Sequence, residues 1–388
     1  MQREIITARP DWQQQAKAVG FDHAFGDDGV PYWHETAYYQ FTLEEIERDL
    51  EAPTRQLVTM AYQAVDHILG RDDLMRRLAI PEAAWRYIRA SWRRGDTDLY
   101  GRFDLRYDGS GPPKLYEFNA DTPTALFEAA VFQWQWREQN VVRGALPEHT
   151  NQFTSIHEKL IAAFGSLGLG ARTLHLSAAR EIDEDRITVE YLEDCAREAG
   201  VATQLVSIAD IAVTADGRLT DPDHRTITDL FKLCPWELVL VEEFGTLLLH
   251  DAVRVIEPPW KMALASKGLL PVLWEMFPGH ELLLPAYFDD DPRVADLGTS
   301  VARKPLRARE HAHIDHKRAL GRLPPAVGPY GPEGFVVQAL AELPGFSGNW
   351  PVIGSWVIAG QSAGIGIREE AAVISGDRAR FVPHIILG

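Results

Sequence analysis

The chain is poor in cysteine, and its basic residues are outnumbered by acidic ones. Only Cys195 and Cys234 are present among 388 residues, with no CxxC pair. This disfavours a disulfide framework and a structural zinc site. Lysine and arginine total 39 against 56 aspartate and glutamate residues, a formal charge of −17. We therefore expect no nucleic-acid partner, although a few converging arginine and lysine side chains can still bind a small anion.

Long apolar runs are absent as well. The N-terminal stretch has no apolar core, and no run of about 18 uncharged apolar residues occurs. We expect a cytoplasmic protein with no membrane partner. The patterns GxxxxGK[ST], GxGxxG and GxSxG are also missing, which argues against a P-loop, a dinucleotide-binding fold and an esterase-type nucleophile elbow.

What is present is enough apolar sequence, 46% of the chain, to bury a large core in two or more lobes. Periodicity divides the chain into four parts and indicates an α+β or α/β fold. Residues 1–98 are expected to be mostly helical, and residues 99–165 to form a hairpin followed by helices. Residues 166–260 alternate strand and helix like a small α/β lobe, and residues 261–388 are rich in strands.

Local signals place two helices in the first part. Thr42 and Glu45 form a capping box ahead of an apolar series, and Pro53 is expected to kink or divide the helix that follows. Pro81 suits the first turn of another helix.

Polar residues alternate along two predicted strands after residue 99. Arg102 and Asp104 share one side of the first strand, and Glu117 and Asn119 share one side of the second, beyond a turn rich in glycine and proline. A hairpin would point all four toward one surface. Carboxylate and amide oxygens suit Mg²⁺, and an arginine suits the charge that shifts in phosphoryl transfer. The alternative is a solvated or salt-bridged hairpin face, which the spacing alone slightly favours.

Three basic residues stand in unusual contexts. Lys267 begins an apolar stretch and Lys304 lies between a strand and a proline, so each is either a part-buried phosphate-binding cation or an ordinary surface lysine. Arg368, beside two glutamates, is either a catalytic cation or an ion-pair partner. A histidine run has a spacing that fits no familiar zinc site: His311, His313 and His316.

Taken in order, these motifs resemble the glutathionylspermidine synthase family. The matching segments are Arg102-Phe103-Asp104, Glu117-Phe118-Asn119-Ala120-Asp121-Thr122, the run from Lys267 to Trp274, Lys304-Pro305 and Gly366-Ile367-Arg368. The resemblance extends over nearly the whole chain and is to the stand-alone synthetase-like branch without an amidase domain. It implies an ATP-grasp fold with a small lobe of pre-ATP-grasp type and an N-terminal helical segment.

The resemblance also implies roles for the hairpin residues. Asp104, Glu117 and Asn119 would hold Mg²⁺, Arg102 would contact the transferred phosphate, and Arg368 would be a catalytic arginine.

Further positions are implied to bind ATP and the substrates. Lys267 and Lys304 match lysines that bind the ATP phosphates. The adenine would be received by a hinge at Gln338, Ala339 and Leu340. Thr122 matches a serine beside glutathione, and an acidic pair near the peptide and amine substrates is matched by Glu184 and Asp185.

The implied reaction joins a carboxylate to an amine. ATP activates a peptide-like acid as an acyl phosphate, and an amine or polyamine then attacks to give an amide. Because an acyl phosphate must be shielded from water, a loop that closes over the site is expected.

The chain departs from the family at three places. The family's glycine-rich loop after the Lys-Pro pair is here the glycine-poor segment 306–311, in which Arg307 and Arg309 could replace amide donors. Ala125 replaces a cysteine and Leu233 a threonine. A nucleotide-binding regulatory or interaction protein without ligase activity remains an alternative, as does an acidic α/β protein whose polar cluster is purely structural.

Overall fold

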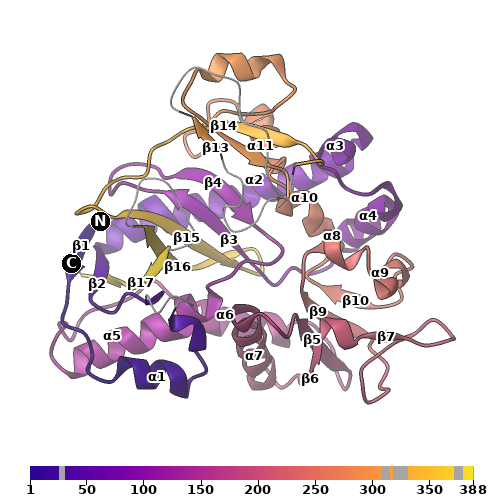
Figure 1. Ribbon diagram of the computed structural model, residues 1–388, viewed down its shortest axis with the longest axis horizontal. Helices are drawn as coiled ribbons and strands as arrows, with labels where there is room; N and C mark the ends of the chain where they lie inside the picture. Colours follow the sequence, from indigo (N-terminus) through magenta and orange to yellow (C-terminus); the bar gives the residue numbers. More distant parts are fainter. Residues whose placement is uncertain (26–30, 308–314, 318–330, 371–378, 388) are drawn as a thin grey trace.

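A five-stranded antiparallel sheet crosses the middle of the computed structural model (Figure 1). The structure describes residues 1–25, 31–307, 331–370 and 379–387, and the backbone of residues 315–317. The strand order is β17-β16-β15-β3-β4. The bounds are Arg380–Val382 for β17, Gln361–Glu370 for β16, Trp350–Ile358 for β15, Tyr100–Arg106 for β3 and Lys114–Asn119 for β4. The predicted hairpin is confirmed, and it shares one sheet with β15, β16 and β17 from the strand-rich residues 261–388.

The two hairpin strands pair so that one face is polar and the other aromatic. Asn119 lies opposite Arg102, and Glu117 opposite Asp104. Between these pairs, the rings of Phe103 and Phe118 stack with their centroids 3.9 Å apart. Alternation along the strands thus separates the polar residues from the core.

A parallel four-stranded sheet forms the α/β lobe at the lower right of Figure 1, in the order β10-β9-β5-β6. Its strands are β5 (Thr173–Ala178), β6 (Ala202–Ser207), β9 (Asp229–Leu233) and β10 (Arg254–Ile256). Helix α7 (Asp183–Glu198) connects β5 to β6 and is followed by Gly200, whose φ of 79° favours glycine. The predicted alternation of strand and helix is confirmed.

Two smaller sheets complete the β structure. One has the order β11-β14-β12-β13, with bounds Ala286–Phe288, Phe335–Ala339, Val301–Pro305 and Asp315–Lys317. The other joins β1 (Gln2–Ile5) and β2 (Ala37–Phe41) to β18 (His384–Ile386). A short hairpin is formed by β7 (Ala212–Val213) and β8 (Leu219–Thr220).

Strands β1 and β2 were not expected within the mostly helical residues 1–98. Strand β1 pairs with β2. Strand β2 also pairs in parallel with β18, more than 340 residues further along the chain, and this contact brings the two ends together (Figure 1). Short strands with such a distant partner leave no local signal.

Helices surround the sheets. Near the N-terminus they are α1 (Trp12–Ala18), η1 (Asp22–Ala24), η2 (Glu45–Glu51), α2 (Ala52–Leu69), α3 (Asp72–Arg77), η3 (Glu82–Ala84) and α4 (Trp85–Arg94). After the hairpin come η4 (Glu128–Phe132), α5 (Gln133–Val142) and α6 (Ile156–Gly165). The remainder are η5 (Ile208–Asp210), α8 (Trp236–Val239), α9 (Glu243–Leu248), η6 (Pro259–Lys261), α10 (Met262–Ala265), α11 (Leu269–Met276) and η7 (Pro292–Leu297).

The predicted capping box is confirmed, and the helix is divided just ahead of Pro53, where η2 ends and α2 begins. The N–H of Glu45 donates to Thr42 Oγ1 over 3.2 Å, and the N–H of Thr42 donates to Glu45 Oε2 over 2.8 Å. The chain then forms the wider π-helical turn η2, and Pro53 lies in the first turn of α2. A proline is tolerated there because the first turn of an α-helix has N–H groups without intrahelical partners.

Within the ranges that the structure describes, no helix combines the length and the apolar character needed to cross a bilayer.

The sheet that joins the chain ends provides a test of the fold. Ile385 in β18 is fully buried, so Ile385→Ala should lower the free energy of unfolding by about 2–5 kcal/mol. Ile5 in β1 is 71% exposed, and Ile5→Ala should change it by less than about 0.5 kcal/mol. Chemical denaturation of both variants measures the difference. Equal, small losses would show that β18 does not pack as described.

Candidate active site

The polar face of the hairpin is a hydrogen-bonded cluster. Arg102 Nε donates to Asp104 Oδ1 over 2.7 Å, and Asn119 Nδ2 donates to Asp104 Oδ2 over 3.1 Å and to Glu117 Oε1 over 3.4 Å. The side chains of Arg102 and Asp104 are almost completely buried. The four predicted residues therefore lie together, with Arg102 and Asp104 buried and Glu117 and Asn119 half-buried.

Basic residues from three distant segments reach this face. Arg368, on β16, donates from Nη2 to Asp104. Lys267 Nζ lies 3.1 Å from Glu117 Oε2. Lys304, on β12, donates from Nζ to Gln338 Oε1 over 2.8 Å and to the carbonyl of Tyr116 over 2.9 Å, beside Glu117 in β4. Pairing of β16 within the central sheet and packing of β12 against the hairpin bring these side chains together.

Burial and the charges of the cluster shift two pKa values. Burial on its own would raise the pKa of Asp104, but Arg102 and Arg368 outweigh it, so this pKa is lower than usual. Burial lowers the pKa of Lys304 to about 8, against the opposing charge of Glu117. At neutral pH both groups are therefore mainly charged.

The cluster carries an excess of positive charge within an acidic chain. Four basic side chains meet two carboxylates, so 4 − 2 leaves +2. The basic side chains are Arg102, Lys267, Lys304 and Arg368, and the carboxylates are Asp104 and Glu117. Such an arrangement is complementary to a polyanion such as a triphosphate.

The same face offers ligands for a hard cation. Asp104 and Glu117 both lie within hydrogen-bond distance of one amide nitrogen of Asn119, so the three groups are close enough to share one ion. Rotation of the Asn119 amide would present its oxygen in place of the nitrogen. Two carboxylates and an amide oxygen fit Mg²⁺.

A pocket adjoins the hairpin face. It contains about 510 Å³ of space that includes its open mouth, and Glu117, Asn119, Thr122, Lys267 and Arg307 help to line it. Thr122 and Lys267, predicted separately, therefore border the same space.

The predicted adenine hinge is only partly joined to this cluster. Gln338 accepts from Lys304 and donates from Nε2 to the carbonyl of Leu115 over 3.0 Å. The N–H groups of Ala339 and Leu340 are engaged in backbone hydrogen bonds of 2.8 and 2.9 Å to neighbouring segments. Adenine binding at these positions stays a prediction.

The predicted acidic pair lies at the start of α7 and is connected to the hairpin face through a single residue, Thr124. The hydroxyl of Thr124 hydrogen-bonds to Glu184, and the carbonyl of Thr124 accepts from Arg102 Nη1. Asp185, the next residue of α7, contributes a like charge that also acts on Glu184.

Sequence reasoning missed two residues beside this acidic pair. His23 Nε2 lies 3.0 Å from Glu128 Oε1, and ligand atoms of His23, Glu128 and Glu184 all lie within 4.8 Å of one another. Imidazole and carboxylates also bind divalent transition metals. Burial and the charge of Glu128 raise the pKa of Glu184 to about 7. Burial lowers the pKa of His23, but Glu128 outweighs it and the pKa is raised. An isolated histidine and a glutamate 105 positions away give no pattern that a sequence reading could detect.

Part of the prediction falls outside the described residues. Of the glycine-poor segment 306–311, the structure describes Leu306 and Arg307. His311 and His313 lie beyond the described ranges, and the structure describes His316 only through the backbone of β13.

The structure is a mixed α/β protein with a buried cluster of charged side chains whose chemistry suits a cation and a polyanion. Residues 3–387 match the family described as glutathionylspermidine synthase preATP-grasp, and the chain belongs to this family. The resemblance noted from the motifs is thus confirmed.

Relatives agree with this family, and a solved structure has a similar fold. A Haemophilus influenzae protein whose name describes an acid–amine ligase is 40% identical over 97% of each chain. The Escherichia coli bifunctional glutathionylspermidine synthetase/amidase is 25% identical over 91% of this chain and 60% of its own length. The trypanothione synthetase of Crithidia fasciculata is 25% identical over 83% and 52%. The chain therefore spans little more than half of these two longer relatives. A glutathione synthetase-like effector from Globodera pallida has a similar fold, with a TM-score of 0.57 at 9% identity, covering 97% of this chain and 96% of that one.

The raised pKa of Glu184 predicts a pH dependence of stability. Between pH 4.5 and about 7 the native carboxyl keeps a proton that the unfolded chain has released, so stability falls as the pH rises through this range. Glu184→Gln removes the titration. The variant should gain stability relative to the parent as the pH rises from 5 to 8, as urea denaturation at each pH measures.

Asp194→Asn, at an exposed position of the same helix, is the control and should follow the parent. A parallel pH dependence of Glu184→Gln and the parent would contradict the assignment.

Proposed function

We propose that the protein is an ATP- and Mg²⁺-dependent carboxylate–amine ligase that forms an amide through an acyl phosphate. The observation that carries this proposal is the convergence of four basic side chains, three of them from distant segments, on two carboxylates and an asparagine of one hairpin. Family membership supports it, and so does the relative whose name describes an acid–amine ligase.

An ATP-grasp arrangement is part of the proposal. The parallel sheet within residues 166–260 would be the pre-ATP-grasp lobe, and residues 261–388 would supply most of the nucleotide-binding lobe together with the hairpin of residues 99–165. Residues 1–98 would be the helical N-terminal part of the same synthetase unit.

The metal would be held by Asp104, Glu117 and Asn119. When bound, Mg²⁺ would neutralise charge on the phosphates. Lys267 and Lys304 would bind the phosphates as point charges, because both already lie beside the hairpin. Lys267 pairs with Glu117, and the charge of Glu117 also acts on Lys304. Gln338, Ala339 and Leu340 would border the adenine.

Two arginines would act on the reacting groups. Arg102 and Arg368 are both held by Asp104, so their guanidinium groups are fixed in place before a substrate binds. Preorganised cations stabilise the charge that develops on a phosphoryl or acyl group, and burial strengthens this effect. The buried surroundings of Arg102 and Asp104 would also keep water from an acyl phosphate.

The acceptor side would be formed by Thr122, Glu184 and Asp185. Thr122 lines the pocket beside the metal ligands, and Glu184 is linked to Arg102 through Thr124. A carboxyl with a pKa near 7 can attract an ammonium group and accept its proton, which frees the amine lone pair for attack. We propose a peptide-like acid and an amine or polyamine as the substrate pair, consistent with the names of the longer relatives.

A nucleotide-binding protein without ligase activity is the second candidate. It is favoured by the segment after Lys304, where Leu306 and Arg307 stand in place of glycines. Side chains at these positions restrict the backbone freedom with which amide groups reach a phosphate.

Ligand-dependent melting tests the nucleotide site. Mg·ATP at 100 times its dissociation constant should add about 2.7 kcal/mol to the free energy of unfolding, because it binds only the folded chain. A saturable rise in melting temperature that requires both Mg²⁺ and ATP is the expected result. A melting temperature that does not change with Mg·ATP would indicate that the cluster has only a structural role.

Phosphate release on offering panels of peptide-like acids and amines separates the two candidates. The ligase requires release that depends on an acid and an amine together. Mg·ATP binding without release across the panel would favour the non-catalytic protein.

Removing one phosphate-binding charge tests the site assignment. Lys304→Met should weaken Mg·ATP binding by about tenfold or more, since a buried cation close to the phosphates is lost. Lys114→Met removes a lysine of the same hairpin whose Nζ contacts the carbonyl of Glu281, and should leave binding unchanged. Isothermal titration of both folded variants makes the comparison. Equal affinities would exclude Lys304 from the nucleotide site.

A further inference from the structure

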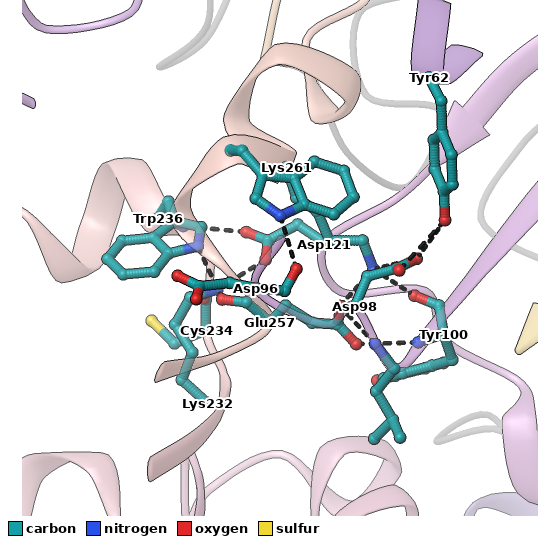
Figure 2. Close-up of polar contacts among 12 residues, drawn as sticks. Tyr62, Asp96, Asp98, Tyr100, Asp121, Lys232, Cys234, Trp236, Glu257 and Lys261 are labelled. Atoms are coloured by element: carbon teal, nitrogen blue, oxygen red, sulfur yellow. Dashed lines mark hydrogen bonds and ion pairs between the residues drawn. The ribbon is translucent and has the colours of Figure 1, made fainter. Parts of the chain in front are cut away.

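Two buried ion pairs fasten the hairpin to the α/β lobe (Figure 2). One joins Asp121, two residues beyond the end of β4, to Lys232 in β9. The other joins Glu257, directly after β10, to Lys261. Each of the four side chains is at most 2% exposed. None of them has a role in the chemistry proposed above.

The Asp121 carboxylate is held at both oxygens. Lys232 Nζ donates to Oδ1 over 2.6 Å, and the backbone N–H of Trp236 donates to Oδ2 over 3.0 Å. Lys232 also donates to the carbonyl of Cys234 over 2.9 Å, and its Nζ lies 4.8 Å from the centroid of the Trp236 ring. The chain that leaves β4 is therefore attached at two points to residues 232–236.

Glu257 holds the start of the other hairpin strand. Its carboxylate accepts from the N–H of Leu99 over 3.1 Å and from the N–H of Tyr100 over 3.0 Å. Lys261 donates to Glu257 and, over 2.7 Å, to the carbonyl of Tyr100. The indole N–H of Trp236 donates to the Glu257 carbonyl over 3.1 Å, which links the two ion pairs (Figure 2).

Both attachments lie at the end of the hairpin that carries the candidate site. Arg102 and Asn119 face each other across the strands. Tyr100 precedes Arg102 by two residues, and Asp121 follows Asn119 by two. Three residues after Asp121, the carbonyl of Thr124 accepts the hydrogen bond from Arg102. A displacement of this loop would therefore remove a partner of Arg102.

We propose that Asp121 and Lys232 are positioning residues that hold residues 120–125 where Thr124 binds Arg102 and Thr122 lines the pocket. A buried ion pair commonly adds little stability compared with apolar residues of the same volume, because desolvation offsets the attraction. Two oriented donors on one carboxylate do, however, specify a single placement of the loop. The consequence for nucleotide binding rests on the proposed function, whereas the placement of the loop does not.

The double variant Asp121→Asn/Lys232→Met removes both charges at nearly constant volume. We expect its melting temperature to stay close to that of the parent. Amide hydrogen exchange within residues 120–125 should become at least about tenfold faster, since a segment with fewer anchors opens more often. The dissociation constant of a non-hydrolysable ATP analogue with Mg²⁺ should rise by about tenfold or more, because a misplaced site residue weakens every contact that depends on it.

Asp121→Glu is the second variant. It keeps the negative charge but lengthens the side chain by one methylene, so a positioning role predicts faster exchange in residues 120–125 and weaker nucleotide binding. A purely electrostatic or stabilising role predicts parental behaviour. This variant decides the question if the double variant does not fold.

Arg172 and Asp229 provide a matched control. Asp229 begins β9, is fully buried and pairs with Arg172 over 2.9 Å, but these contacts do not involve the hairpin. Arg172→Met/Asp229→Asn should leave exchange within residues 120–125 and the affinity for the nucleotide unchanged.

The outcomes separate this proposal from the proposed function. A folded Asp121 variant with parental exchange in residues 120–125, or with an increase spread evenly over the chain, would overturn the positioning role. Local exchange that rises without any loss of affinity in a parent that binds Mg·ATP would overturn its connection to the site. A parent that binds no Mg·ATP would instead contradict the proposed function, and the exchange measurement would still decide the placement of the loop.

Discussion

The carboxylate of Asp104, held between two arginines, is the interaction on which the site depends. It receives Arg102 from its own strand, Arg368 from β16 and the amide of Asn119 from β4. A buried carboxylate without such partners would be protonated or would destabilise the chain. These contacts therefore fix three strands of the central sheet relative to one another. They also leave the guanidinium groups oriented before any ligand arrives.

This constraint explains how an acidic chain can present a concentrated positive region, which the proposed polyanion site requires. The net charge of −17 is spread over the whole molecule, whereas the +2 excess of the cluster is concentrated within one buried region. Local field strength depends on nearby charges and on the exclusion of water, so the global charge does not decide it. The neighbouring group of His23, Glu128 and Glu184 has the opposite character, with two carboxylates for one imidazole. The positive cluster around Asp104 and this negative group are thus bridged by a single residue, Thr124.

Several predictions from local pattern were confirmed because their cause is local. Alternation in β3 and β4 requires only that successive side chains point to opposite faces, and the capping box of Thr42 and Glu45 spans three residues. Pro53 also acts locally, because the chain changes from the wider π-helical turn η2 to the α-helix α2 just ahead of it. Strands β1 and β2 escaped detection since β18, the strand that links them to the other end of the chain, is distant in sequence.

By itself, the sequence determined the hairpin and its polar face, the βαβ alternation of the lobe and, through the order of its motifs, the family. Each depends on spacing or on residue identity, which the sequence states directly. Only the tertiary structure decided that Arg368 and Lys304 meet the hairpin, that His23 and Glu128 join Glu184, and that Asp121 is bound to Lys232. Those contacts join residues from 56 to 264 positions apart, and their partners are selected by how sheets pair and pack, which no local pattern encodes.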